Sequence, residues 1–132
     1  MEISKELEYT IIGLIDLAEK DKRSTAVEIA RNMQMPEEQI KKIFQKLSKA
    51  EIVRSVKGAG GGYELAISLE EITLGDLKRA VSGEHFVVRC LEDESSCSRI
   101  DICRIYDGMG KFQVMWNNFL DSVSIKELVS GV

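Results

Sequence analysis

Three cysteines lie within fourteen residues of this sequence, and the chain has no others. Cys90, Cys97 and Cys103 are spaced by six and five residues in the stretch CLEDESSCSRIDIC. Thiolates bind soft or borderline metal ions, and groups of three or four cysteines hold zinc or iron–sulfur clusters. This spacing is wider than that of a C-x(2)-C zinc knuckle, so the loop suits a cluster better than a single ion. We therefore expect metal or redox chemistry here.

The composition indicates a globular protein. The chain has 132 residues, enough for one domain with a sizeable core, and 44% of them are hydrophobic. The N-terminus lacks the apolar run of a secretory signal, and no apolar stretch is long enough to span a membrane. We expect a cytoplasmic protein with no membrane partner. In that compartment, close-spaced cysteines more often serve metal or redox chemistry than a structural disulfide.

Charge is distributed unevenly along the chain. The formal net charge is −4, yet residues 40–58 carry +5, so the remaining residues carry −9. The basic residues of this segment are Lys41, Lys42, Lys46, Lys49, Arg54 and Lys57. A basic strip on an acidic body attracts phosphate, because the local field rather than the net charge governs such binding. Charge alone is equally consistent with a solvated helix face.

The basic strip follows two predicted helices. Ser4 and Thr25 stand at N-cap positions and predict helices over 4–20 and 25–32, separated by the polar stretch EKDKRS. Pro36 suits the first position of a third helix, whose apolar residues recur at helical spacing. The outer face of this third helix offers Glu38, Lys41, Lys42, Gln45 and Lys49.

A glycine-tipped hairpin follows the third helix. Its two strands are predicted to contain Ile52, Val53 and Val56, then Tyr63, Leu65 and Ile67. The turn GAGGG, which includes Gly60, has no side chains that keep another backbone away. Helix, turn, helix and hairpin in this order predict a winged helix-turn-helix that binds double-stranded DNA. Residues expected at base edges or phosphates are Glu38, Lys41, Lys42 and Gln45 on the helix, and Arg54, Lys57 and Gly60 on the wing.

The second half of the chain predicts a dimer. Thr73 and Asp76 open a helix over 74–82, the cysteine loop spans 83–103, and a long helix covers 104–122 before a short one that begins at Ser124. The long helix carries one apolar stripe, and such a surface at the end of a small domain favours a homodimer. The predicted fold is therefore mainly α, with a winged helix-turn-helix domain (1–82), a cysteine loop (83–103) and a dimerisation helix with its short C-terminal helix (104–132).

The sequence resembles a known family. The stretch VRSVKGAGGGYEL is preceded by IKKIFQKLSKAEIV and followed by EITLGDL and the three cysteines. Together these segments resemble the bacterial iron–sulfur cluster regulators and nitric-oxide sensors, the IscR/NsrR-like family, over essentially the whole chain. The resemblance implies homodimers that bind imperfect palindromic operators. It places reading positions at Glu38, Lys41 and Lys42, and a minor-groove contact at Lys57, where many members have arginine.

The same resemblance implies a 2Fe–2S or 4Fe–4S cluster on the three cysteines, whose state sets operator affinity in response to nitric oxide, redox state or iron supply. Three cysteines leave one cluster position without a ligand. Some members place a histidine three residues after the third cysteine, where this chain has Tyr106. Others use a carboxylate near the start of the first helix, reached from the partner subunit, and Glu8 stands at that place. Without the resemblance, Glu8 is a solvated helix residue.

Three alternatives remain open. The cysteines can act without a cluster as a thiol switch that oxidises to a disulfide or persulfide. The protein can instead regulate through a protein partner. A third possibility is a zinc site made by Cys90, Cys97, Cys103 and the single histidine, His85. An enzyme is not expected, because the sequence has no convincing nucleophile–base pair and the GAGGG turn leads into a strand rather than a helix.

Overall fold

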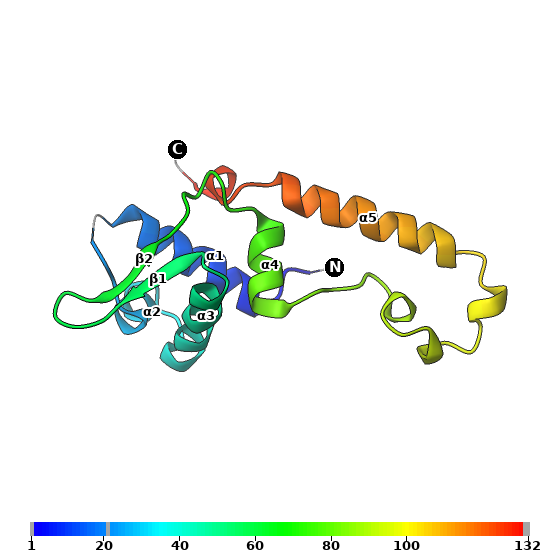
Figure 1. The fold of residues 1–132 in the computed structure, drawn as a ribbon, viewed down its shortest axis with the longest axis horizontal. Coiled ribbons are helices and arrows are strands. Elements are labelled where there is room, and N and C mark those ends of the chain that lie inside the picture. Colours follow the sequence, from blue (N-terminus) through cyan, green and yellow to red (C-terminus); the bar gives the residue numbers. More distant parts are fainter. Residues whose placement is uncertain (1, 21, 131–132) are drawn as a thin grey trace.

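The structure is a computed structural model, and it describes residues 2–20 and 22–130. Residue 21, in the polar stretch between the first two helices, lies outside the described residues. So do residues 1 and 131–132, the first residue of the predicted 1–82 domain and the last two of the predicted 104–132 segment. Figure 1 shows an elongated molecule, with a helical body at one end and an arm at the other. The hairpin projects from the body on the side away from the arm.

The described residues form a mainly helical fold with one small sheet, which confirms the predicted fold class. In chain order the elements are α1 (Lys5–Glu19), α2 (Ala26–Asn32), α3 (Glu37–Lys49), β1 (Val53–Val56), β2 (Gly62–Leu65), α4 (Leu74–Ser82) and α5 (Tyr106–Ser122). Three single 3₁₀ turns lie between α4 and α5, and a fourth (Ile125–Leu128) follows α5. The arm consists of α5, the cysteine loop and the linker that joins the loop to α4.

Side-chain caps fix most of the helix starts. The Ser4 hydroxyl accepts from the Leu7 N–H at 3.1 Å, and the Thr25 hydroxyl accepts from the Glu28 N–H at 3.1 Å. At α4, Thr73 and Asp76 form the reciprocal capping box that their spacing predicts. The expected place of Pro36 is wrong by one residue. Pro36 is the extended N-cap residue of α3, which begins at Glu37.

The hairpin packs one face against α3. Strands β1 and β2 are antiparallel, and Val53 faces the core from the position opposite Leu65. On the same face, the Tyr63 ring lies 5.1 Å from the Phe44 ring, centroid to centroid. The predicted strands were too long, because Ile52 precedes β1 and Ile67 follows the end of β2. Successive strand residues point to opposite faces, so Arg54 and Glu64 lie on the side away from α3.

The other edge of β2 is fastened to the start of α2. Ser24 and Tyr63 exchange two backbone hydrogen bonds, of 3.2 Å and 2.8 Å. The close approach requires glycine at position 62, where φ is +137° and a Cβ would lie 2.7 Å from the carbonyl carbon of Ser24. The wing is therefore held on both sides, by α3 and by the segment before α2.

The core joins residues from both ends of the chain. Phe44 and Leu14 are fully buried in it, together with Ile125 from the turn after α5. The Ile125 N–H donates to the Ile72 carbonyl, and the Leu74 N–H donates to the Val123 carbonyl, each at 2.8 Å. The three-part division remains a prediction. Its third part returns to the body, and Leu120 and Ile125 help to fill the core there.

A buried carboxylate links the first two helices. Asp16 accepts hydrogen bonds from the Asn32 amide at 2.6 Å and from the Lys20 ammonium at 2.9 Å. Because a buried carboxylate is costly unless it is paired, these partners set how α1 and α2 meet. No helix of the described residues is long and apolar enough to cross a membrane.

We expect Gly62→Ala to lower the free energy of unfolding by at least about 2 kcal/mol, because the new Cβ meets the Ser24 backbone at a left-handed φ. The matched control is Gly60→Ala, which also has a positive φ but open space around it, and should cost about 1 kcal/mol. Urea unfolding followed by circular dichroism measures both. Equal losses would mean that the wing does not depend on the contact with Ser24.

Candidate DNA-binding surface and cysteine loop

Helix α3 buries one face and presents the other to solvent. Ile40, Ile43 and Phe44 are at most 1% exposed. On the opposite side, Glu38, Lys42 and Gln45 are exposed, and Lys41 forms an ion pair with Glu38 at 3.1 Å. The predicted reading residues thus share one solvent-facing surface, and this arrangement lets a helix enter the major groove.

One basic residue of the strip has a different role. The Lys46 ammonium donates to the Val81 carbonyl at 2.9 Å and pairs with the Glu6 carboxylate at 3.2 Å. It therefore ties α3 to α4 and α1 at the surface of the body, with its side chain 44% exposed. The sequence counted this lysine with the phosphate-attracting strip, but its hydrogen bonds keep it among the helices.

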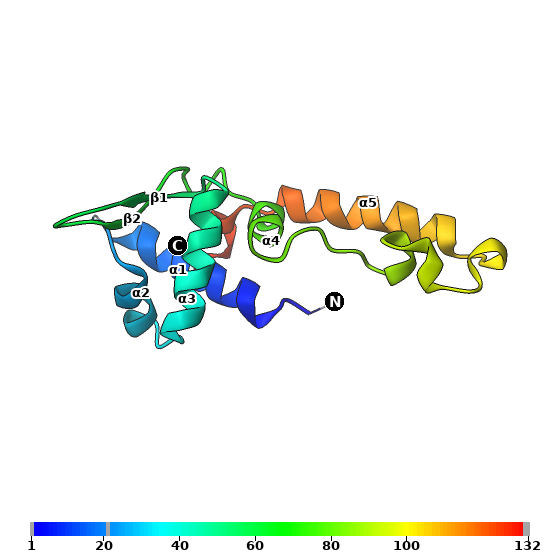
Figure 2. The same cartoon turned by 60° about the horizontal axis from the view of Figure 1, so that its bottom comes forward.

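The wing supplies the second part of this surface. Lys57 and Gly60 lie in the exposed turn between β1 and β2, where Gly58 and Gly60 have φ values of +94° and +74°. No heavy atom lies within 4 Å of a Cβ built on either glycine, so another molecule can approach the backbone there. Arg54 is exposed on β1. Figure 2 shows the hairpin extending past α2 and α3, as a wing must do to reach a neighbouring groove.

The cysteine loop lies at the far end of the arm. Cys90 is in the first 3₁₀ turn (Arg89–Leu91), while Cys97 and Cys103 follow the second (Glu94–Ser96) and third (Ile100–Ile102) turns. All three thiols are free; Cys103 is exposed and the other two are half-buried. Three thiols suit an iron–sulfur cluster as a set of donors. Within residues 2–20 and 22–130, however, no three histidine, cysteine or acidic side chains converge into a metal site.

Tyr106 occupies the position where some family members have a histidine ligand. Its hydroxyl donates to the Glu94 carboxylate at 2.8 Å. That hydrogen bond, together with the negative charge of Glu94, raises the pKa of Tyr106 above its ordinary value. The phenol therefore stays protonated and links the second turn of the loop to the start of α5.

Neither candidate for a fourth ligand lies in the cysteine-bearing turns, residues 89–103. Glu8 is on α1 in the body, where its carboxylate pairs with Lys5 at 3.3 Å. Both ribbon views show the cysteine loop at the opposite end of the arm from α1, so Glu8 of the same chain does not meet the cysteines. His85 is exposed in the linker, and no metal site forms around it within the described part of the chain.

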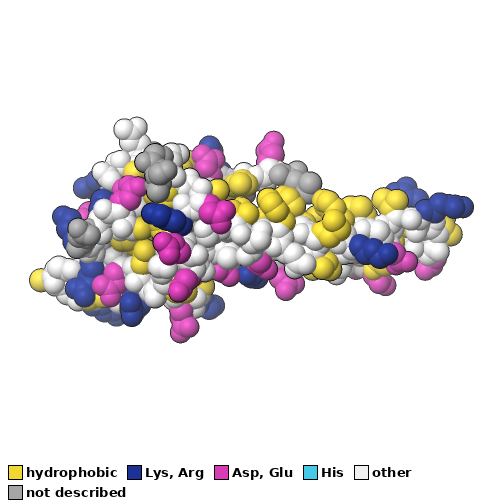
Figure 3. All heavy atoms as spheres, turned by 90° about the horizontal axis from the view of Figure 1, so that it is seen from above, with side chains coloured by type: hydrophobic (Ala, Val, Ile, Leu, Met, Phe, Trp, Pro, Cys, Tyr) yellow, Lys and Arg dark blue, Asp and Glu magenta, His cyan; other side chains and the backbone are white. Residues whose placement is uncertain are grey.

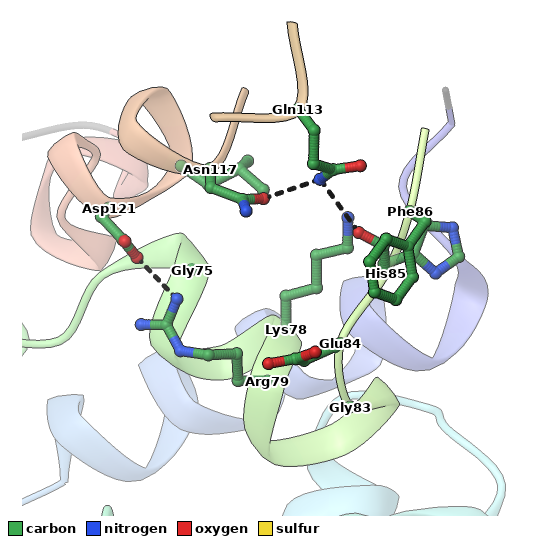
Figure 4. Close-up of a pocket in the computed structure, with 11 residues that line it drawn as sticks. Gly75, Lys78, Arg79, Gly83, Glu84, His85, Phe86, Gln113, Asn117 and Asp121 are labelled. Atoms are coloured by element: carbon green, nitrogen blue, oxygen red, sulfur yellow. Dashed lines mark hydrogen bonds and ion pairs between the residues drawn. The ribbon is translucent and has the colours of Figure 1, made fainter. Parts of the chain in front are cut away.

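A buried glutamine clasps the linker to α5 (Figure 4). The side-chain oxygen of Gln113 accepts from the Val87 N–H at 2.6 Å. Its amide donates to the His85 carbonyl at 3.1 Å and to the Asn117 side chain at 3.0 Å. The sequence analysis did not single out this residue. The signal available was a polar residue on the packed side of an otherwise apolar stripe.

The linker, α4 and α5 enclose a small cavity of about 240 Å³. At one end, Arg79 of α4 pairs with Asp76 and Asp121, each at 2.9 Å. Lys78 lies 6.0 Å from the centre of the Trp116 ring, and burial lowers the pKa of this lysine. These contacts lie at the junction between the arm and the body.

The outer side of α5 is apolar and exposed. The exposed fractions are 58% for Val114, 66% for Met115 and 57% for Phe119. Figure 3 shows hydrophobic side chains gathered along this part of the arm. The predicted apolar stripe is therefore divided, since Leu120 packs into the body while Met115 and Phe119 remain in solvent.

Comparisons with known proteins agree with this geometry. A family model described as Rrf2, iron-dependent transcriptional regulator, matches residues 3–131. The HTH-type transcriptional regulator CymR of Bacillus subtilis is 31% identical over 98% of this chain and 91% of its own length. The HTH-type transcriptional regulator IscR of Sodalis glossinidius is 26% identical over 99% of this chain and 80% of its own length. The solved structure of CymR (YrzC), described as the global cysteine regulator of B. subtilis, matches with a TM-score of 0.75 and 26% identity, over 100% of this chain and 98% of the other.

We expect Gln113→Leu to lower the free energy of unfolding by about 1–3 kcal/mol, because it leaves the Val87 N–H without its partner. Hydrogen exchange at Val87 should also become faster. Asn118→Leu is the matched control, since Asn118 is exposed on the same helix. Urea unfolding and amide exchange check both variants. If both variants were equally stable, the clasp would have no structural role.

Proposed function

The chain belongs to the Rrf2 family of transcriptional regulators, and we propose that it acts as a homodimer whose affinity for its operator depends on the state of the cysteine loop. It is a DNA-binding protein of the winged-helix class and not an enzyme, as its relatives are transcriptional regulators. The observation that carries the proposal is the lysine-bearing exposed face of α3 beside a glycine-tipped wing.

DNA reading is assigned to the exposed residues of α3 and the wing. Lys42 and Gln45 extend into solvent from the middle of α3, where a helix in the major groove meets base edges and phosphates. Lys41 is held by Glu38, so this pair presents an acceptor and a donor together. Lys57, at the tip of the wing, is assigned to the adjacent minor groove. These roles follow from exposure and from the expectations drawn from the family.

A second copy of the chain is assigned to the exposed side of α5. Val114, Met115 and Phe119 form an apolar surface that is costly to leave in water. A two-fold dimer through α5 would present two α3 helices to an imperfect palindrome. Their separation must match half-sites about 34–36 Å apart, or a multiple of that distance, so a small change in the arm alters the fit.

We assign the three cysteines to an iron–sulfur cluster, either 2Fe–2S or 4Fe–4S. Three observations support this assignment. The loop carries three free thiols on single turns, and none of its described residues belongs to the hydrophobic core. The matching family model is described as iron-dependent. When bound, the cluster would supply a centre that reacts with nitric oxide or oxygen. Since Glu8 of the same chain lies in the body, its proposed role as an oxygen ligand requires Glu8 of the partner subunit.

The linker is the proposed route from the loop to the DNA-reading face. Residues 83–88 join α4 directly to the first cysteine-bearing turn, and Gln113 holds their backbone against α5. A rearrangement of the loop therefore pulls on the junction of α4 and α5. Arg79 and Asp121 pair across that junction, and a shift there would rotate the two bodies of a dimer relative to each other.

A cluster-free thiol switch is the second candidate. It is favoured by the absence of a convergent metal site among the described residues and by the exposure of Cys103. Both candidates place the protein in the cytoplasm, where thiols remain reduced until a signal arrives.

Protein purified without oxygen should show broad visible absorption and stoichiometric iron, because three thiolates are available as ligands. Cys97→Ala should lose both, while Ser96→Ala, its neighbour in sequence, should keep them. Glu8→Ala should leave a cluster with a shifted or labile spectrum. Colourless, iron-free protein even after reconstitution would exclude the cluster and leave the thiol switch; zinc in place of iron would indicate a structural site.

Lys42→Ala should weaken binding to an operator selected from a random duplex library. It should also reduce the slope of log affinity against log salt by about 0.9, the loss expected for one phosphate contact. Lys126→Ala is the control, as it removes the same charge from an exposed position outside α3 and the wing. Fluorescence anisotropy at several salt concentrations measures both and reports the number of chains per duplex. An unchanged slope for Lys42→Ala would contradict its place at the DNA.

A further inference from the structure

The face of the wing that points away from α3 carries a row of three charged side chains. In the hairpin register, Arg54 stands directly opposite Glu64. On the other edge of β2, the bridge between Ser24 and Tyr63 brings Arg23 alongside the same glutamate. The Arg23 Nε lies 3.1 Å from one Glu64 oxygen, and the Arg54 Nε lies 3.6 Å from the other. One carboxylate thus lies between two guanidinium groups.

Next to this row, a hollow opens between the wing and the end of α1. It has a volume of about 500 Å³. Its lining includes Lys20, Lys22, Arg23, Gly60, Glu64 and Leu65. Among the lining residues that the structure describes, Glu64 is acidic and three are basic, of which Lys20 is paired with Asp16. The hollow therefore places Lys22, Arg23 and Glu64 beside the glycine turn of the wing.

The contribution of this row to stability is small. The side chains of Arg23, Glu64 and Arg54 are 43%, 37% and 64% exposed. Exposed ion pairs of this kind add little to folding, because water screens them and the side chains lose freedom. A phosphate offers guanidinium groups the same pattern of charged oxygens as a carboxylate does. The two arginines can therefore release the Glu64 carboxylate and bind a phosphate in its place at little cost in stability.

The position of the row matches the geometry of a wing in a groove. The two strands of the duplex border the minor groove, and the groove is narrow, about 6 Å wide. A hairpin placed there has one phosphate backbone on each side. The face packed against α3 is covered, so a phosphate backbone beside the wing would meet the opposite face, which carries Arg54 and Glu64 with Arg23 alongside.

We propose that Glu64 is an internal counterion that holds Arg23 and Arg54 in the free protein, and that both arginines transfer to backbone phosphates when the wing meets duplex DNA. This inference rests on the DNA-binding function proposed above and adds a phosphate site that includes Arg23. Until the exchange takes place, Glu64 repels phosphate. It thereby weakens binding to arbitrary sequence, where the wing is not pressed into the groove by base contacts from α3.

The test uses Glu64→Gln, which keeps the shape of the side chain and removes its charge. Fluorescence anisotropy with a mixed-sequence duplex longer than two helical turns, at several salt concentrations, measures affinity and salt slope. We expect binding at low salt to tighten roughly threefold to tenfold. Arg23→Gln should weaken binding and reduce the slope by about 0.9. Arg23→Gln combined with Glu64→Gln should lose most of the gain.

Glu70→Gln is the matched control, because it removes one negative charge from an exposed position between β2 and α4. Affinity equal to wild type in Glu64→Gln, or a gain that Glu70→Gln shares, would overturn the inference. So would a gain that persists undiminished without Arg23, since repulsion alone would then explain it. A lower melting temperature with unchanged affinity would show a purely structural pair.

The same titration separates this inference from the proposed function. In one outcome, wild-type protein binds a selected operator, and Glu64→Gln binds mixed-sequence DNA no more tightly than wild type does. That result would overturn only the counterion role. Wild-type protein and variants that bind neither duplex would overturn the DNA-binding function, and the counterion role with it.

Discussion

The packing of α3 is the constraint on which the rest of the structure depends. Its buried face supplies Ile40, Ile43 and Phe44 to the core, and the Phe44 ring also meets Tyr63 of the hairpin. One set of apolar contacts therefore fixes both the recognition helix and the wing. Because the apolar side chains of α3 fill the core from one face, its lysines lie on the other, and the proposed DNA-facing surface follows from how the core is filled.

Local signals in the sequence predicted most of the fold. The caps at Ser4, Thr25 and Thr73 and the periodicity of α3 act over a few residues, so they can be read from the sequence directly. Contacts between distant segments left no such signal. Neither the return of Ile125 to the core nor the clasp at Gln113 could be predicted, since each depends on how α5 crosses the body. The roles of the cysteines remain predictions, because their ligand set would be completed outside this chain.

The arm separates two kinds of surface along one molecule. Cations that suit phosphate lie on α3 and the wing, while the cysteine loop lies at the other end, beyond an exposed apolar helix. The loop contributes no residue to the core among the described positions and is made of single turns, so it has little packing energy to resist rearrangement. The body, in contrast, is held by buried side chains from α1, α3 and α4. A signal at the loop can thus change the linker and the arm without unfolding the DNA-reading part.

The burial of Leu120 and Ile125 among the helices of the body also has a consequence for synthesis. The nascent chain cannot complete the core of its DNA-reading part when residue 82 leaves the ribosome, because these two core residues have yet to be translated. Chains released early would expose the pocket that Ile125 fills and would be substrates for proteases. A chain that ended before the cysteine loop would therefore lack two residues of the core that the DNA-binding part needs.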